Sequence, residues 1–284
     1  KEMVLSSGWA GSQLLNSDDY RAYVGGTTGL IYGFVNDGFY TVDDFKPFDS
    51  KSRTWTLKDG VVNSSPLSGD PRPGNAKFKK LTPVDENSAN PYTLTDDDRT
   101  VIGNTTPKFS GGFGLNATFK GFDVSAFFNF MYDFDVFNAN KVMMTTWASN
   151  NYNNISAAKR WRNFDDMGNE IRYSPEILAE FNKNATMWNP TSIGRPIAMS
   201  YAVEDGSFLR LNTATIGYTL PRAWTNKVGL SRVRFYASGY NLFTITGYSG
   251  YDPEVDIATG LTPNIDNNRY PRSRTYTFGV QLTF

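Results

Sequence analysis

The chain has 284 residues, of which 39% are hydrophobic, 15% aromatic and 20% charged. It contains neither cysteine nor histidine, which excludes thiol nucleophiles, disulfides, histidine general bases and Cys- or His-ligated metal sites within the chain. The 28 Lys and Arg residues balance the 28 Asp and Glu residues. A net charge of zero argues against a nucleic-acid partner, because binding to phosphates needs a surplus of basic residues.

Membrane-spanning helices are also excluded, because no stretch of the sequence approaches the roughly 18 consecutive apolar residues that such a helix needs. The mean hydropathy is −0.43, and 21 Phe and 16 Tyr residues carry much of the apolar content. Strands of a membrane β-barrel are only about 10 residues long and are recognised by alternation, so this class stays open.

Two weak strand signals open the chain, at residues 19–24 and 30–40. A stronger pair follows at residues 108–119 and 122–132, each with apolar side chains on one face and mostly small or polar side chains on the other. The Lys-Gly pair at residues 120–121 suits a tight turn, since glycine adopts positive φ without strain. Together these residues predict a long hairpin with one aromatic-rich face.

The second half of the chain repeats this pattern. Residues 208–220 and 232–243 form a second predicted hairpin, joined by residues 221–229, although the alternation in its first strand is less clean. The last stretch, residues 273–284, alternates strictly and ends on an aromatic side chain. It predicts a final strand of the same kind.

Three long connections separate these strands, at about residues 43–106, 134–203 and 244–272. Compact soluble domains rarely contain structureless loops beyond about 12–15 residues, whereas outer-membrane barrels alternate short periplasmic turns with long extracellular loops. The asymmetry therefore favours an all-β fold, an antiparallel transmembrane β-barrel, over a soluble β-sandwich with the same periodicity. Inside the second connection, a Ser-Pro-Glu helix-start signal predicts a short helix over residues 174–184.

Five motifs occur in a characteristic order. The last three read GSFLRLNTATIGYTLP at residues 206–221, YNLFTITGYSGYDPEV at 240–255 and LTPNIDNNRYPRSRTYTFGVQLTF at 261–284. The first two read TGLIYGFVNDGFY at 28–40 and DRTVIGNTTPKFSGGFGLNATFKGFD at 98–123. These motifs closely resemble those of SusC/RagA-type TonB-dependent outer-membrane transporters, which carry a YGY-x-x-DG-type segment and a DR-x-x-IG…P-K-F…KGFD stretch ahead of a similar C-terminal end.

The resemblance implies that residues 1–284 form the C-terminal part of a 22-stranded barrel, because the alternating segments supply only about seven to nine strands. Such transporters also have a signal peptide, a TonB-contacting segment and a plug domain, and we expect these to be absent from this chain. A partial barrel leaves two unpaired strand edges, which are costly in lipid. We therefore expect the N-terminal half of the same transporter as a partner.

The resemblance further implies a place in the outer membrane of a Gram-negative bacterium, in contact with membrane lipid. It implies a SusD-like surface lipoprotein over the extracellular mouth, TonB acting through the missing N-terminal part, and an oligosaccharide or peptide as ligand. The leading hypothesis is an energy-coupled, TonB-dependent nutrient importer. The alternatives are a passive porin-like barrel and a secreted, soluble all-β glycan-binding protein.

An acidic D-x-N-G-D-G run precedes the DR-x-x-IG motif in many relatives and looks like a cation-binding loop. Here residues 84–91 read VDENSANP, so the glycine for the sharp turn is missing and the acid spacing between Asp85 and Asp98 does not suit Ca²⁺. We therefore expect no metal and no other cofactor. We expect a solvated acidic loop in which Asp98 pairs with Arg99 or another nearby base.

Ligand contacts are predicted on the long loops, because aromatic faces stack on sugar rings while amide and carboxylate groups bind hydroxyl groups. Packing within or between loops is the alternative role for each residue, and some residues of these loops are expected to contact the lipoprotein. The candidates are Trp147, Asn151, Tyr152, Trp161, Arg162, Trp188, Tyr248, Tyr251 and Asp252.

The loops carry pairs of acidic residues, and arginines lie near the ends of the predicted strands. The acid pairs Asp165-Asp166 and Asp252 with Glu254 lie in polar loops, and nothing in the sequence places two of them across a cleft, so we predict no enzyme. Arginines near the strand ends predict interfacial anchoring or a salt bridge inside the barrel, with Arg234 as a candidate contact of the plug.

Overall fold

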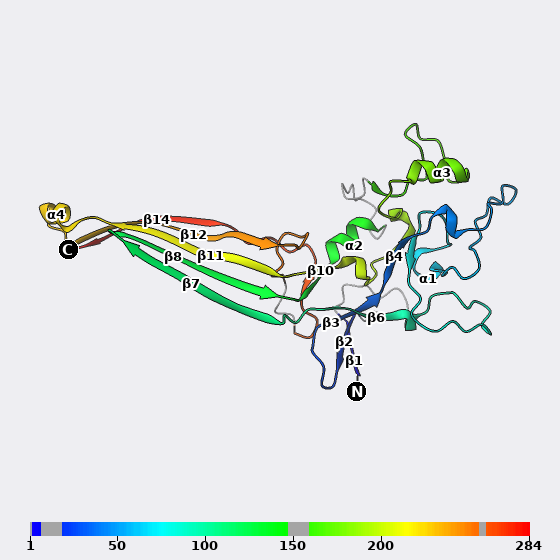
Figure 1. The fold of residues 1–284 in the computed structure, drawn as a ribbon, viewed down its shortest axis with the longest axis horizontal. Coiled ribbons are helices and arrows are strands. Elements are labelled where there is room, and N and C mark those ends of the chain that lie inside the picture. Colours follow the sequence, from blue (N-terminus) through cyan, green and yellow to red (C-terminus); the bar gives the residue numbers. More distant parts are fainter. Residues whose placement is uncertain (1, 7–18, 147–158, 256–259) are drawn as a thin grey trace. The chain divides into compact units, whose positions relative to one another are not determined.

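The computed structural model describes residues 2–6, 19–146, 159–255 and 260–284 (Figure 1). The chain divides into two compact units, each assembled from segments that are far apart in the sequence. Unit 1 comprises Lys1–Thr105, Phe137–Val203 and Ala258–Asn268, and unit 2 comprises Thr106–Val136, Glu204–Ile257 and Arg269–Phe284.

Unit 2 is built on a five-stranded antiparallel sheet with the strand order β14-β12-β11-β8-β7. Figure 1 shows its long strands lying side by side. All five were predicted from alternation, and their bounds agree closely with the predicted ones. They are β7 (Phe109–Phe119), β8 (Phe122–Tyr132), β11 (Phe208–Thr219), β12 (Arg232–Thr246) and β14 (Thr275–Thr283).

Two short connections link neighbouring strands of this sheet. Lys120 and Gly121, between β7 and β8, both have positive φ, at 46° and 89°. This pair of angles matches the right-handed twist of the flanking strands and confirms the predicted tight turn. The connection between β11 and β12 holds α4 (Arg222–Thr225) and the 3₁₀ turn η6 (Asn226–Val228).

A bulge explains why the alternation in β11 is less clean than in its neighbours. The register shifts between Leu211 and Thr213, and Asn212 is an extra residue of β11 against β8, whereas against β12 the extra residue lies in β12, between Tyr240 and Phe243. Before the bulge, odd-numbered residues such as Leu209 face the same side as Phe130 of β8; after it, even-numbered residues such as Ile216 do so. One inserted residue exchanges the two faces of a strand, because side chains alternate with period two.

The register gives the sheet one apolar face and one mostly polar face. The apolar face carries an aromatic or aliphatic side chain at nearly every position, and many of these are exposed, for example Phe278 at 80%. Its members include Phe109, Phe113, Leu115, Phe119, Phe122, Val124, Phe128, Phe130, Leu209, Leu211, Ile216, Tyr218, Phe235, Phe243, Ile245, Tyr276, Phe278, Val280 and Leu282. The opposite face carries Ser110, Asn116, Asp123, Ser125, Asn129, Arg210, Thr215, Arg234, Ser238, Thr277 and Gln281, among others.

Unit 1 contains shorter strands. One antiparallel sheet has the order β1-β2-β3-β6, a two-stranded sheet pairs β4 with β5, and β13 pairs in parallel with the end of β9. Strand β6 falls within residues 43–106, which the sequence analysis assigns to a loop. The strand bounds in unit 1 are β1 (Glu2–Leu5), β2 (Tyr20–Tyr23), β3 (Leu30–Phe34), β4 (Asn36–Phe39), β5 (Ala76–Phe78), β6 (Arg99–Asn104) and β13 (Ile265–Asp266). Strands β9 (Asp135–Asn138) and β10 (Val203–Asp205) each have residues in both units.

Short helices and 3₁₀ turns occupy the long connections in unit 1. The helix predicted over residues 174–184 is confirmed as α3, and Pro175 stands at its first turn, where its missing N–H costs nothing. The helices are α1 (Ser65–Ser68), α2 (Ala139–Thr145) and α3 (Pro175–Asn182), and the 3₁₀ turns are η1 (Val42–Asp44), η2 (Asp96–Asp98), η4 (Pro190–Ser192) and η5 (Ser200–Ala202).

The loops of unit 1 pack around a hydrophobic core of their own. Its largest buried side chains come from distant parts of the chain, among them Tyr20, Phe78, Phe137 and Trp188. Within the described ranges of the chain, no helix is long and apolar enough to cross a membrane.

Candidate functional site

An ion pair crosses the polar face of the sheet in unit 2. Arg234 of β12 reaches over β11 to Asp123 of β8, and its Nε lies 2.8 Å from Asp123 Oδ1. The strand between them carries Gly217, where a Cβ would stand 2.5 Å from Arg234 Nη2 and 2.6 Å from Asp123 Oδ1. The absence of a side chain at this position lets the two charges meet. This is the salt-bridge alternative predicted for Arg234.

A second charged group lies further along the same face and holds the last long connection. Arg210 of β11 is buried and binds both carboxylate oxygens of Asp252, with Nη1 at 3.2 Å from Oδ2. Glu254 lies 3.7 Å from Arg210 and 3.0 Å from Arg272, which in turn lies 3.8 Å from Asp252. Two arginines and two carboxylates therefore neutralise each other. Such a network fixes a loop because removing one member leaves a buried charge without its partner.

Apolar side chains support this network within unit 2. Phe134, Val136, Phe208, Tyr248 and Val255 form a separate small core. Because Tyr248 and Val255 flank Asp252 in the sequence, the loop is held by hydrophobic burial and by charge together.

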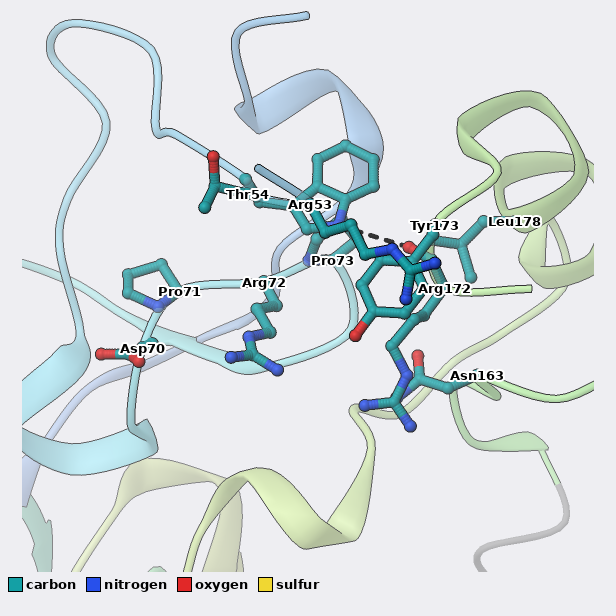
Figure 2. Close-up of a pocket in the computed structure, with 11 residues that line it drawn as sticks. Arg53, Thr54, Asp70, Pro71, Arg72, Pro73, Asn163, Arg172, Tyr173 and Leu178 are labelled. Carbon is teal, nitrogen blue, oxygen red and sulfur yellow. Dashed lines mark hydrogen bonds between the residues drawn. The ribbon is translucent and has the colours of Figure 1, made fainter. Parts of the chain in front are cut away.

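A pocket of about 310 Å³ lies among the long connections of unit 1 (Figure 2). One wall comes from the first connection and the other from the residues leading into α3. The walls are joined by a hydrogen bond from Trp55 Nε1 to the carbonyl oxygen of Arg172, at 3.3 Å. The lining residues are Arg53, Thr54, Trp55, Asp70, Pro71, Arg72, Pro73, Asn163, Arg172, Tyr173 and Leu178.

Aromatic rings in tilted contact lie beside this pocket. The Phe48 ring lies 4.7 Å from that of Trp55 and 6.1 Å from that of Tyr173. The guanidinium of Arg53 lies 5.3 Å from the Tyr173 ring centre and that of Arg172 lies 5.8 Å from it. These cation–π contacts orient two of the three arginines of the pocket.

Two of the predicted ligand-contact tryptophans are buried in this structure. Trp161 is 3% exposed and packs with Ile171 and Leu178. Trp188 is 2% exposed, donates its Nε1–H to the carbonyl oxygen of Thr145 at 2.9 Å, and belongs to the main core of unit 1. Both side chains therefore pack within the loops, which is the alternative role predicted for each candidate.

The other described candidates are divided between packing, ion pairing and exposure. Arg162 binds Asp166 at 2.8 Å and lies over the ring of Phe181. Tyr248 is buried, Asp252 belongs to the Arg210 network, and Tyr251 is 80% exposed. Trp147, Asn151 and Tyr152 lie outside the described residues. The described candidates therefore differ in their exposure and in the contacts that they make.

Asp98, in the acidic segment, is a buried carboxylate rather than a solvated one. It accepts hydrogen bonds from Leu81 N, Thr82 N, Thr82 Oγ1 and Thr95 N at 2.7–2.9 Å and from Lys80 Nζ at 3.3 Å. Burial by itself raises the pKa of Asp98, but the hydrogen bonds outweigh it and hold the pKa at about 2. The base that pairs with Asp98 is Lys80, whereas Arg99 pairs with Asp96.

Among the residues that the structure describes, no group of three or more acidic side chains is placed to hold a metal ion. Asp165, a candidate for catalysis, instead closes a turn by accepting hydrogen bonds from Met167 N and Asn169 N. These bonds, together with those from the Asn169 side chain, lower the pKa of Asp165.

Sequence reasoning did not find the arginines of the pocket. Arg53 and Arg72 lie in one long connection and Arg172 in the next, about a hundred residues away. No motif links them, and only the folding of two connections against each other brings them together.

Comparisons with known proteins agree with this fold. A scan against models of protein families finds no match. The chain is 30% identical over 266 residues to TonB-dependent receptor P3 of Formosa agariphila, a match that covers 92% of this chain and 22% of the receptor. It is 37% identical over 86 residues to TonB-dependent receptor SusC of Bacteroides thetaiotaomicron, which covers 30% of this chain and 8% of SusC.

The fold is similar to part of the RagAB peptide importer in its closed-closed state, with a TM-score of 0.58 and 20% sequence identity. That likeness covers 100% of this chain and 25% of the importer chain. This chain therefore spans about a quarter of the length of the proteins that it matches. The predicted antiparallel barrel fold and the predicted resemblance are both confirmed: the chain is similar to part of TonB-dependent receptors, SusC among them, and has the fold of part of the RagAB importer.

Proposed function

We propose that this chain forms part of the barrel of an outer-membrane transporter that imports nutrients by TonB-dependent energy coupling. The observation that carries the proposal is the difference between the two faces of the sheet in unit 2. One face is apolar across all five strands, and the other carries charges paired above a glycine. A barrel wall needs this arrangement, with apolar side chains toward lipid and polar ones toward the lumen.

The apolar face is too extensive for a surface in water. Soluble monomers rarely expose apolar patches larger than a few hundred Å², and here exposed aromatic or aliphatic side chains occur on every strand of the sheet. Placed in the outer membrane of a Gram-negative bacterium, the same side chains would be stabilised by lipid. The paired charges would then lie inside the barrel, where a plug domain could contact them.

The proposed importer takes up oligosaccharides or peptides. A SusD-like lipoprotein would deliver the ligand to the long loops, and TonB would pull on a plug outside this segment. The names of the similar proteins support this assignment, since SusC is a TonB-dependent receptor and RagAB is a peptide importer. The barrel wall described here would act as the rigid frame and as one side of the ligand path.

The proposal is tested by uptake in cells that carry the whole transporter. We expect uptake of a labelled ligand to stop when either TonB or the transporter is deleted, and the SusD-like lipoprotein to co-purify with the transporter from detergent extracts. Uptake that persists without TonB would identify a passive porin-like barrel. Recovery of the protein from buffer without detergent would support a soluble glycan-binding protein instead.

A further inference from the structure

The pocket in the loops of unit 1 is cationic and offers groups that are not used by the fold. Three of its lining residues are arginines and one, Asp70, is an acid. Arg72 is exposed, and no group in the described part of the chain accepts a hydrogen bond from its guanidinium or pairs with it. In Figure 2 the carboxylate of Asp70 points away from the side of the pocket where Arg172, Tyr173 and Asn163 gather.

The other two arginines are held in place by their neighbours, but their guanidinium groups keep N–H donors that no described carboxylate binds. Arg53 stacks over Tyr173 and is exposed, with no described carboxylate within ion-pair distance. Arg172 pairs through its Nε with Glu170, which leaves its two Nη groups without a described acceptor. Because guanidinium groups bind carboxylate and sulfate oxygens through paired N–H donors, the pocket suits an anion.

The remaining polar groups of the pocket suit hydroxyl groups. Thr54 and Tyr173 carry hydroxyls, Asn163 carries an amide, and Asp70 accepts hydrogen bonds from hydroxyl donors. A volume of about 310 Å³ is at the small end of the range for ligand pockets, about 300–1,000 Å³. It therefore suits one unit of an oligomer rather than a whole chain.

An extended peptide is a poorer fit. Peptides commonly bind by adding a strand to a sheet edge, where backbone groups are available in a row. The lining residues lie in turns, in one isolated bridge at Thr54 and in α3 at Leu178, and none belongs to a strand of a sheet.

We propose that this pocket binds an acidic unit of an oligosaccharide, one that bears a carboxylate or a sulfate group. Arg53, Arg72 and Arg172 bind the anionic group, and Asn163 and Tyr173 bind ring hydroxyls. The inference rests on the proposed importer function and adds the substrate class to it. It makes the first and second long connections a selective site for charged glycans.

The test uses the whole transporter in detergent together with its lipoprotein partner. The variant is Arg53→Gln with Arg72→Gln, since both side chains are exposed and are not part of a core. The matched control is Lys58→Gln, which removes a positive charge from the same connection outside the pocket. The probes are tetragalacturonate and its methyl ester, a sulfated tetrasaccharide and its desulfated form, and a hexaglutamate peptide.

We expect at least one acidic saccharide to bind the native protein at least about tenfold more tightly than its neutral form, with an affinity that falls as salt increases. We expect the double variant to lose at least about tenfold in this affinity and the control to lose less than twofold. Preference for the neutral saccharides or for hexaglutamate, no binding of any acidic saccharide, or equal binding by the variant and the native protein would overturn the inference.

Failure of this inference is distinguishable from failure of the importer function. If TonB-dependent uptake occurs and the double variant takes up its ligand normally, the importer stands and the anion pocket falls. If acidic saccharides bind and the double variant loses them, but no uptake depends on TonB, the pocket stands and the importer function falls. A native-like heat-modifiable band on gels for each variant shows that the barrel has folded.

Discussion

Asp98 is a residue whose charge is stabilised by its surroundings in the folded state. Its pKa of about 2 lies below the ordinary value of 3.8 for an aspartate. A group with a lowered pKa contributes stability above its ordinary pKa, and this contribution is lost as the pH falls from about 4 toward 2. The first long connection, which Asp98 ties together through Leu81, Thr82 and Thr95, is therefore expected to loosen in acid.

Replacement of Asp98 by Asn tests this expectation. At pH 7 we expect Asp98→Asn to lower the free energy of unfolding by about 2 kcal/mol, because one pKa unit corresponds to about 1.4 kcal/mol. The difference from the native protein should shrink as the pH falls toward 2. Thermal unfolding of the detergent-solubilised transporter at several pH values measures both effects.

The control for that experiment is Asp97→Asn, because Asp97 is adjacent and exposed. It should change the midpoint of unfolding very little. An equal loss in both variants, or a loss in Asp98→Asn that does not depend on pH, would contradict the role assigned to the buried carboxylate.

The residue type of an aromatic side chain in these loops does not predict whether it is buried or exposed. Trp161 and Trp188 have the residue type of a ligand-stacking side chain, and both are buried in cores of unit 1. Tyr251, chosen on the same grounds, is exposed. Residue type fixes how much apolar area a side chain offers but not which neighbour covers it, and burial in a loop depends on contacts distant in sequence.

At the scale of elements, the strands of unit 2 were predictable because each has one apolar face. Period-two alternation located the ends of β7, β8, β11, β12 and β14 to within three residues. The short strand β6 was missed because it has only six residues and lies in a connection dominated by turn-forming residues. Its partner β3 is about seventy residues earlier in the chain.

Neighbouring positions on β14 give a direct test of the two faces. Phe278 lies on the apolar face opposite Ala237, and Thr277 lies on the polar face opposite Ser238. We expect Phe278→Arg to reduce the amount of folded protein in the outer membrane strongly, because an arginine toward the middle of the lipid costs about 2–4 kcal/mol. Thr277→Arg should fold nearly as well as the native protein.

Heat-modifiable migration on gels of outer-membrane fractions measures the folded amount of each variant. Both positions are exposed in the sheet, so crowding of the introduced side chain does not explain a difference between them. Equal yields, or a lower yield for Thr277→Arg, would show that the apolar face does not meet lipid.

At the scale of the whole molecule, the sheet of unit 2 has two edges, β7 and β14. Each has one neighbour among the described strands, so backbone donors and acceptors remain along its other side. In lipid each unpaired group costs several kcal/mol. A closed wall needs further strands at both edges, in agreement with a match to about a quarter of the similar transporters.

We therefore predict that residues 1–284 expressed alone with an export signal do not form a heat-modifiable outer-membrane species. Co-expression with the remaining strands of the barrel as a second polypeptide should restore it. Gels of outer-membrane fractions from the two strains provide the comparison. A stable folded barrel formed by residues 1–284 alone would refute the need for further strands.

The arrangement of the long connections was the least predictable feature of the molecule. Their lengths and their position between strands followed from the sequence, but the contact between residues 53–72 and 163–178 did not. Strand pairing is encoded by local alternation, whereas loop packing depends on individual hydrogen bonds such as that from Trp55 to Arg172. The pocket that this contact creates therefore could not be predicted from the sequence.

The bulge at Asn212 has a consequence for anyone who exchanges segments between related barrels. The odd-numbered residues of β11 face outward before this position and the even-numbered ones after it. A chimera joined on opposite sides of the bulge in its two parents would gain or lose one residue. The side chains of this strand beyond the junction would then lie on the opposite face of the sheet. Junctions in this strand should therefore be aligned on the bulge itself rather than on the overall length of the strand.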